Sequence, residues 1–272
     1  MIHNEIKIWG SAEYAGADKD FSPVLSTYIL KDGPKKGAVL IFPGGGYSFT
    51  SWREAEPIAI WANNAGYNAF VLYYSVSPNR HPQPLLDATR ALCLIRDRAE
   101  EWNTDKDRIA VCGFSAGGHL AASLAAHYNC DYLKEVRGME EGKNRPDAVI
   151  LCYPVITSGK NAHAGSFKNL LGENAPSHLM EHLSIEKHVT DKFPPAFIWS
   201  TYNDSAVPVE NSLLLAAALR SSNVPFELHI FPDGPHGLSL CNEITNEGRT
   251  DFINPEVAVW AKLCESWLKK TL

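Results

Sequence analysis

Apolar residues along this chain occur in two kinds of segment that alternate. Short, nearly continuous apolar runs are typical of strands covered by helices on both faces; they lie at residues 38–42, 69–74, 108–112, 149–153, 195–201 and 226–231. Between them, apolar residues recur every three or four positions, which predicts amphipathic helices; these segments are 51–65, 85–102, 116–122, 208–219 and 257–267. This alternation predicts an α/β fold, a mostly parallel sheet with helices on both faces.

Three segments depart from this alternation. Residues 6–9 and 24–30 alternate apolar and polar positions, which predicts an opening pair of antiparallel strands. Residues 155–194 are rich in Ser, Asn, His and Gly, with only short helical possibilities such as 176–183. We expect a small cap-like insertion there, over the sheet and the site that it carries. Without an internal repeat or long linker, residues 1–272 are expected to form a single domain.

The most informative motif reads Gly-Phe-Ser-Ala-Gly at 113–117, between a predicted strand and a predicted helix. It matches G-x-S-x-G, the nucleophile elbow in which the serine occupies a strained turn. Side chains at Gly113 and Gly117 would collide with that turn, so glycine is required there. The turn would expose the hydroxyl of Ser115 and place the first amides of the helix beside whatever that hydroxyl attacks. The motif therefore predicts Ser115 as a nucleophile.

A serine nucleophile needs a base and a carboxylate that orients the base. The carboxyl ends of parallel strands meet in one crevice, so these partners should follow strand ends. His236 follows the last predicted strand, and Asp204 follows the strand before it, in the chain order expected for this fold. Asp233 is the alternative carboxylate, although a role in its own turn explains it better. Asp204 has an alternative role as the cap of the helix at 208–219.

Donors for a developing oxyanion are also recognisable. Three glycines directly follow the strand at 38–42, where a backbone without side chains can approach the nucleophile with free amides. We expect the N–H groups of Gly45, Gly46 and Ala116 to form the oxyanion hole. A phosphate-binding loop fits poorly, because no Gly-Lys-Ser/Thr follows the glycines.

With these motifs in place, the whole chain resembles the α/β-hydrolase superfamily, and in particular its hormone-sensitive-lipase-like and acetyl-xylan-esterase-like carboxylesterases. The His-Gly-Gly-Gly motif of that family appears as Pro-Gly-Gly-Gly at 43–46, with Pro43 in place of a supporting histidine. Residues 113–121 are similar to the elbow of small bacterial acetyl esterases that act on sugars. The resemblance implies an eight-stranded sheet with an antiparallel second strand. It also implies acyl-enzyme chemistry with no metal or organic cofactor.

The expected substrate is a small ester. Tyr47, Phe114 and Tyr202 flank the motifs and are expected to line a small pocket. The short insertion at 155–194 suits an acetyl group better than a long acyl chain. We therefore expect a serine esterase that deacetylates sugars or xylo-oligosaccharides. Alternatives are an amide hydrolase, such as an arylformamidase or a small serine peptidase, and a non-catalytic binding protein on the same fold.

Charge and apolar content argue against two classes of partner. The formal net charge of -6 and the lack of a basic cluster argue against nucleic acid and anionic membrane surfaces as partners. No apolar stretch approaches the ~20 residues of a membrane span. The N-terminus lacks a positively charged segment followed by an apolar run, so no secretory signal is expected. Nothing in the sequence indicates an oligomeric state.

The cysteines and histidines outside the proposed site suggest no further chemistry. The six cysteines form no C-x-x-C pair, which favours reduced thiols in a cytoplasmic protein. Cys112 lies within a strand, where burial makes a thiol inert. His178 and His182 are four residues apart, but no Glu follows the first as in a zinc-protease motif. We expect them to be surface residues and expect no metal site.

Overall fold

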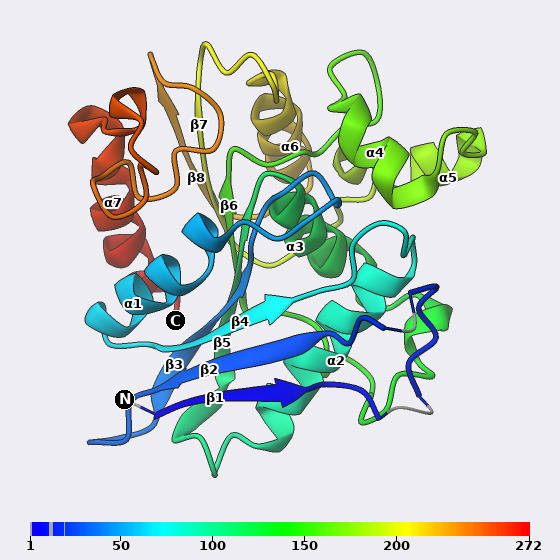
Figure 1. Ribbon diagram of the computed structural model, residues 1–272, viewed down its shortest axis with the longest axis vertical. Coiled ribbons are helices and arrows are strands. Elements are labelled where there is room, and N and C mark those ends of the chain that lie inside the picture. The colour runs from blue at the N-terminus through cyan, green and yellow to red at the C-terminus, as the bar shows by residue number, and fades with distance from the viewer. Residues whose placement is uncertain (1, 11–12, 19) are drawn as a thin grey trace.

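The computed structural model describes residues 2–10, 13–18 and 20–272, and its centre is one eight-stranded sheet (Figure 1). The strands are β1 (Ile2–Lys7), β2 (Val24–Ile29), β3 (Lys36–Phe42), β4 (Asn68–Tyr73), β5 (Thr104–Phe114), β6 (Ala148–Cys152), β7 (Ala196–Thr201) and β8 (Phe226–Phe231). They lie in the order β1-β2-β4-β3-β5-β6-β7-β8. β2 pairs antiparallel with β1 and β4, and the pairs from β4 to β8 are parallel. The expected antiparallel second strand is confirmed.

Helices cover both faces of the sheet, as the apolar runs predict (Figure 1). One face carries α2 (Gln83–Asp97), α3 (Ala116–His127) and α6 (Glu210–Ser221), and the other carries α1 (Glu56–Asn64) and α7 (Pro255–Thr271). In β3, Leu40 and Phe42 pack into the first core while Val39 and Ile41 pack into the second. Successive strand side chains point to opposite faces, so a doubly covered strand has to be apolar throughout.

Several element boundaries differ from the predicted ones, among them the end of α2 and the start of β5. α2 ends at Asp97, before the end of the apolar stripe. Trp102, the last residue of that stripe, lies in a turn and packs into the core from there. Its ring lies 5.2 Å from that of Phe70, measured between centroids. β5 begins at Thr104, four residues before the predicted start, because Thr104 pairs with Lys36 across a register shift. A pattern of apolar residues does not predict the polar residues at the solvent end of a strand.

The predicted helix at 51–65 is interrupted. It consists of a 3₁₀ turn, η1 (Trp52–Glu54), followed by α1. The break lies at Ala55, whose backbone angles of φ -106° and ψ -104° are not helical. This interruption places Glu54 in the interior of the protein, where it is 3% exposed.

The segment 155–194 contains two short helices, α4 (Ala164–Leu171) and α5 (Ser177–His182), and a 3₁₀ turn, η3 (Ile185–Lys187). The helix expected near 176–183 is confirmed as α5. Both α4 and α5 lie toward the same end of the molecule as α6, beyond the carboxyl end of β6 (Figure 1). Among the described parts of the chain, every helix is too short or too polar to cross a membrane.

Candidate active site

Ser115 lies in the strained turn between β5 and α3. Its backbone angles are φ 53° and ψ -116°, a conformation that few non-glycine residues adopt. A Cβ atom at Gly113 would lie 2.1 Å from the carbonyl oxygen of Gly117, and one at Gly117 would lie 2.0 Å from that of Phe42. These contacts confirm that the elbow requires glycine two residues before and two residues after the serine.

The structure brings Ser115, His236 and Asp204 into one hydrogen-bonded chain. His236 Nε2 lies 2.8 Å from Ser115 Oγ, and His236 Nδ1 lies 2.6 Å from Asp204 Oδ2. A carboxylate only accepts, so Nδ1 carries the proton and the Nε2 lone pair faces the serine hydroxyl. The Asp204 side chain is only 1% exposed. Its other oxygen accepts the N–H groups of Ala206 and Val207, each at 2.9 Å, so Asp204 also orders the loop that holds it.

Asp233, the alternative carboxylate, lies elsewhere. It accepts a hydrogen bond from the side-chain amide of Asn203. Asn203 in turn accepts the N–H of Gly234 at 2.9 Å. Asp233 therefore organises the turn before His236, as its place in the sequence suggests.

The glycine loop borders the same cavity as the serine. Gly45 and Gly46 have φ angles of 130° and 63°. Within the described ranges, the N–H groups of Gly45, Gly46 and Ala116 have no hydrogen-bond acceptor. Gly45, Gly46, Ser115 and His236 together line a cavity of about 370 Å³. Free amides beside a serine hydroxyl are the arrangement that an oxyanion hole requires.

A buried carboxyl group, Glu54, holds the glycine loop. Its Oε2 accepts the N–H of Gly44 at 2.7 Å, and its Oε1 accepts the hydroxyl of Tyr153 at 2.7 Å. Burial raises the pKa of Glu54, and these two hydrogen bonds partly oppose that effect. The carbonyl of Pro43, where the related family has histidine, accepts the hydroxyl of Tyr74 at 2.6 Å. Nothing in the sequence singled out Glu54, because its partners are distant along the chain.

The segment 155–194 also contributes to the cavity. His163 and Asn169 line it, and Asn169 Nδ2 donates to the carbonyl of Gly46 at 2.8 Å. The Nδ1 atom of His163 lies 2.8 Å from Ser166 Oγ, and burial lowers the pKa of His163. The segment therefore forms one wall of the cavity. Its weak periodicity gave no sign of which residues would do so.

Tyr47, Phe114 and Tyr202 are predicted to line the pocket, but none of them is among the described residues that line the cavity with Ser115. Tyr47 is 2% exposed, and its hydroxyl lies 2.9 Å from His119 Nδ1 beneath the glycine loop. Phe114 is fully buried against the aromatic ring of Trp260. Tyr202 is 70% exposed on the surface. Adjacency to a motif does not determine which way a side chain points.

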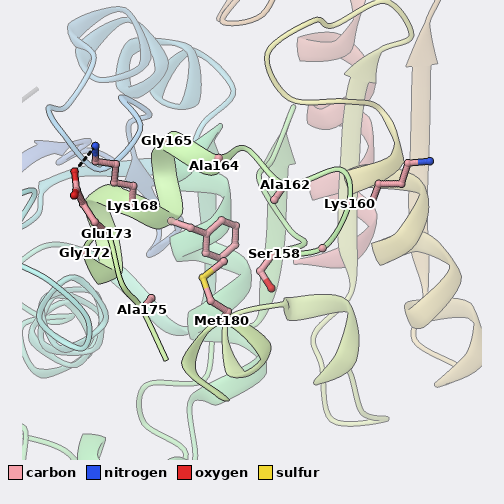
Figure 2. A pocket seen from close by; sticks show the side chains of 12 residues that line it. Ser158, Lys160, Ala162, Ala164, Gly165, Lys168, Gly172, Glu173, Ala175 and Met180 are labelled. Atoms are coloured by element: carbon pink, nitrogen blue, oxygen red, sulfur yellow. Dashed lines mark ion pairs between the residues drawn. The ribbon is translucent and has the colours of Figure 1, made fainter. Parts of the chain in front are cut away.

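A second, larger cavity of about 640 Å³ adjoins the first, and the two share Gly165. Figure 2 shows this cavity between the loop at 158–162 and helices α4 and α5. Ala164 and Met180 lie along it, and Lys168 and Glu173 form an ion pair of 2.7 Å at one end. The surface beside Ser115 is thus an extended depression.

The sheet order, the elbow and the strand-end loops define an α/β hydrolase. The structure of an acetyl ester-xyloside bifunctional hydrolase from Caldicellulosiruptor lactoaceticus is similar, with a TM-score of 0.86 and 43% identity over 98% of this chain and 96% of that one. The carboxylesterase Cest-2923 from Lactobacillus plantarum has a TM-score of 0.84 and 26% identity, over 99% of this chain and 98% of that one. Residues 28–219 match the family model BD-FAE, and the chain belongs to this family.

Two curated relatives are longer proteins. Endo-1,4-beta-xylanase B of Butyrivibrio fibrisolvens is 43% identical over 87% of this chain. The acetylxylan esterase of Xylanibacter ruminicola is 31% identical over 78% of it. This chain spans 38% of the first relative and 43% of the second. It therefore corresponds to one part of each of these proteins.

Proposed function

We propose that this protein is a serine carboxylic ester hydrolase that removes acetyl groups from acetylated sugars, in particular xylo-oligosaccharides. The observation that carries the proposal is the hydrogen-bonded chain from Asp204 through His236 to Ser115, which ends at a cavity with unpaired amides. A nucleophile, an oriented base and oxyanion donors are what acyl transfer needs. We assign the catalytic roles below on that ground.

The first half of the reaction makes an acyl-enzyme. The Oγ of Ser115 forms a bond to the ester carbonyl carbon while His236 Nε2 takes its proton. The carbonyl oxygen becomes an oxyanion that accepts hydrogen bonds from the amides of Gly45, Gly46 and Ala116. His236 then gives its proton to the leaving sugar hydroxyl as the ester C–O bond breaks. Asp204 stabilises the imidazolium that exists between these two proton transfers.

The second half restores the serine. Water attacks the acetyl carbon of the acyl-enzyme and gives its proton to His236 Nε2. The same amides of the glycine loop and of Ala116 stabilise the second oxyanion. Collapse of this intermediate breaks the bond to Ser115 Oγ, which regains its proton from His236, and acetate leaves. The reaction uses only groups of the chain and water.

The proposed substrate rests on the relatives and on the shape of the site. One solved relative is named as an acetyl ester-xyloside hydrolase and one curated relative as an acetylxylan esterase. The cavity beside Ser115, about 370 Å³, suits an acetylated sugar residue, and the adjoining cavity offers room for the rest of the oligosaccharide. We propose that residues 1–272 act as one domain, with 155–194 as a cap over this site.

We further propose that the protein works in the cytoplasm. All six cysteines lie in the described part of the chain and are free, and five of them are buried. Burial raises the pKa of Cys93 to about 11 and that of Cys241 to about 12, which keeps these thiols protonated and unreactive. Free buried thiols are typical of a reducing compartment.

The test is hydrolysis of a chromogenic ester series from acetyl to octanoyl, together with acetylated xylo-oligosaccharides, by the wild type and Ser115→Ala. We expect turnover of acetyl esters that falls with chain length, release of acetate from the oligosaccharides, and a loss of about 10⁴-fold or more in kcat in the variant. Matching circular dichroism spectra establish that the variant is folded. Turnover of formamides but not esters would instead indicate an amide hydrolase. No turnover by folded wild type would indicate a binding protein.

A further inference from the structure

Three histidines from different elements meet at the carboxyl end of α3, the helix that follows Ser115. His127 is the last residue of α3, His182 is the last residue of α5, and His188 follows η3. Each offers a ring nitrogen, and these nitrogens lie within 4.8 Å of one another. The ring centroid of His127 lies 4.2 Å from that of His182 and 4.9 Å from that of His188. His178 is exposed as expected, whereas His182 is partly buried and belongs to this cluster.

Hydrogen bonds to backbone carbonyls hold two of the three rings. His127 Nε2 lies 3.0 Å from the carbonyl oxygen of His182, and His188 Nε2 lies 3.1 Å from that of Glu181. A carbonyl only accepts, so both Nε2 atoms carry hydrogen and both Nδ1 atoms carry a lone pair. Histidines that bind metals commonly donate their second N–H to a backbone carbonyl in this way. Within the described chain, the ring of His182 has no hydrogen-bond partner.

The surroundings suit a cation. The cluster lies at the carboxyl end of α3, where the unpaired carbonyls of the last turn carry partial negative charge. His182 and His188 are only partly buried, which leaves the cluster open to an ion and to water.

We propose that His127, His182 and His188 bind one divalent transition-metal ion of the zinc class, with water as the fourth ligand. Three imidazoles suit zinc and its first-row neighbours, whereas magnesium and calcium prefer oxygen ligands. The rings of His127 and His182 are stacked, with 28° between their planes, so they would have to rotate to bring the three nitrogens to about 2.0–2.1 Å from a common centre. Nothing in the proposed ester hydrolysis requires this ion.

The position of the cluster indicates a structural role. The metal would join α3 to the segment that contains α5 and η3, which already contacts α3 where His119 Nε2 lies 2.8 Å from the carbonyl of Leu183. Ser115 precedes the other end of α3, about 18 Å away along the helix axis. The ion would therefore fix the segment 155–194, and with it the cavity wall that contains His163 and Asn169, to the helix that follows Ser115.

The test is zinc titration of untagged protein, first stripped with a chelator and dialysed, by isothermal calorimetry. We expect one equivalent of Zn²⁺ to bind at micromolar or lower concentration and to raise the thermal unfolding midpoint by several degrees. Loss of an outer-shell partner alone costs metal sites about 10–100-fold in affinity, so His182→Ala and His188→Ala should weaken binding by at least about tenfold. His178→Ala is the matched control, because this exposed histidine on α5 lies outside the cluster.

Cobalt provides a second measurement. Co²⁺ bound by three imidazoles and water should show the intense visible absorption of tetrahedral cobalt, and His188→Ala should lose it. Unfolding midpoints of the variants without metal establish that they are folded. The proposal is overturned if wild-type protein binds no zinc at micromolar concentration. It is equally overturned if His182→Ala and His188→Ala bind as tightly as His178→Ala, since the ion would then be held elsewhere.

Discussion

The hydroxyl of Tyr153 donates a 2.7 Å hydrogen bond to Oε1 of Glu54, although the two residues are 99 positions apart. The same hydroxyl accepts the N–H of Ser239 at 2.9 Å, and the second oxygen of Glu54 accepts the N–H of Gly44 at 2.7 Å. One buried carboxyl group thereby connects the glycine loop, the end of β6 and the chain that follows His236. These are the segments that carry the proposed oxyanion donors and the proposed base.

Replacing Glu54 with glutamine should test this connection. One amide oxygen cannot accept from both Gly44 and Tyr153, so one donor loses its partner, at a cost of about 1–3 kcal/mol in unfolding free energy. The glycine loop should then shift, and kcat for a chromogenic acetate should fall by about tenfold, less than the ~100-fold loss expected for an oxyanion donor itself. Glu56→Gln, at an exposed position two residues on, is the control. An unchanged kcat in folded Glu54→Gln would contradict this positioning role.

Asp204→Asn should separate orientation of the base from loop structure. The asparagine oxygen can still accept the amides of Ala206 and Val207, so the unfolding midpoint should change little. Its NH₂ group would face His236 Nδ1 and favour the tautomer with hydrogen on Nε2, which cannot take the proton of Ser115. We expect kcat to fall by about 10⁴-fold.

Asp233→Asn is the matched control for Asp204→Asn in the same kinetic assay. This carboxylate contacts Asn203 in a turn, so its loss should leave kcat within a few-fold of the wild-type value. If the two substitutions lowered kcat equally, the assignment of Asp204 as the orienting carboxylate would be wrong.

The second cavity should matter only for long substrates. Ala164 is exposed at the start of α4 and lines this cavity, so Ala164→Trp should fill part of it without disturbing the core. We expect kcat/KM for acetylated xylo-oligosaccharides to fall by about tenfold, through loss of binding contacts worth about 1.4 kcal/mol. Turnover of a small chromogenic acetate serves as the internal control and should not change. Equal losses on both substrates would mean that the cavity does not bind the oligosaccharide.

A buried aspartate far from the serine should govern stability at mildly acidic pH. Asp87 accepts hydrogen bonds from Trp9 Nε1 at 2.7 Å, the N–H of Ser75 at 2.8 Å and Gln83 Nε2 at 2.9 Å. Burial nevertheless raises its pKa to about 6 from an ordinary value of 3.8. The folded protein therefore binds this proton more tightly than the unfolded chain does. The resulting stabilisation is complete below pH 3.8 and is lost as pH rises to about 6.

Asp87→Asn removes that titration. In urea unfolding between pH 4 and pH 7, the wild type should lose on the order of 2–3 kcal/mol relative to the variant as pH rises. Asp107→Asn, at an exposed aspartate, is the control and should follow the wild type across the series. A constant difference between wild type and Asp87→Asn over this range would show that Asp87 does not titrate there.

The sequence by itself determined the parts of this protein that depend on local rules. The parts of strands that are covered on both faces are apolar at successive positions, so the central residues of β3 through β7 are recognisable from short stretches of chain. The motif at 113–117 identifies the elbow at Ser115, and a side chain at Gly113 would collide within the motif itself, with the carbonyl of Gly117. The collision at Gly117 is with the carbonyl of Phe42 in β3, which only the structure shows. The loops with Asp204 and His236 follow from topology, because parallel strands place their carboxyl ends together. Their catalytic roles remain predictions.

Only the tertiary structure decided which side chains meet across the chain. Glu54 lies beside Gly44 and Tyr153 because a break in a predicted helix turns it inward, a result of packing that no local pattern encodes. Tyr47 and Phe114 adjoin the motifs yet face the core, because backbone direction is set by the packed elements around them. The cluster of His127, His182 and His188 likewise arises where separate elements converge. Contacts between distant segments depend on three-dimensional packing, so the periodicity within one segment does not predict them.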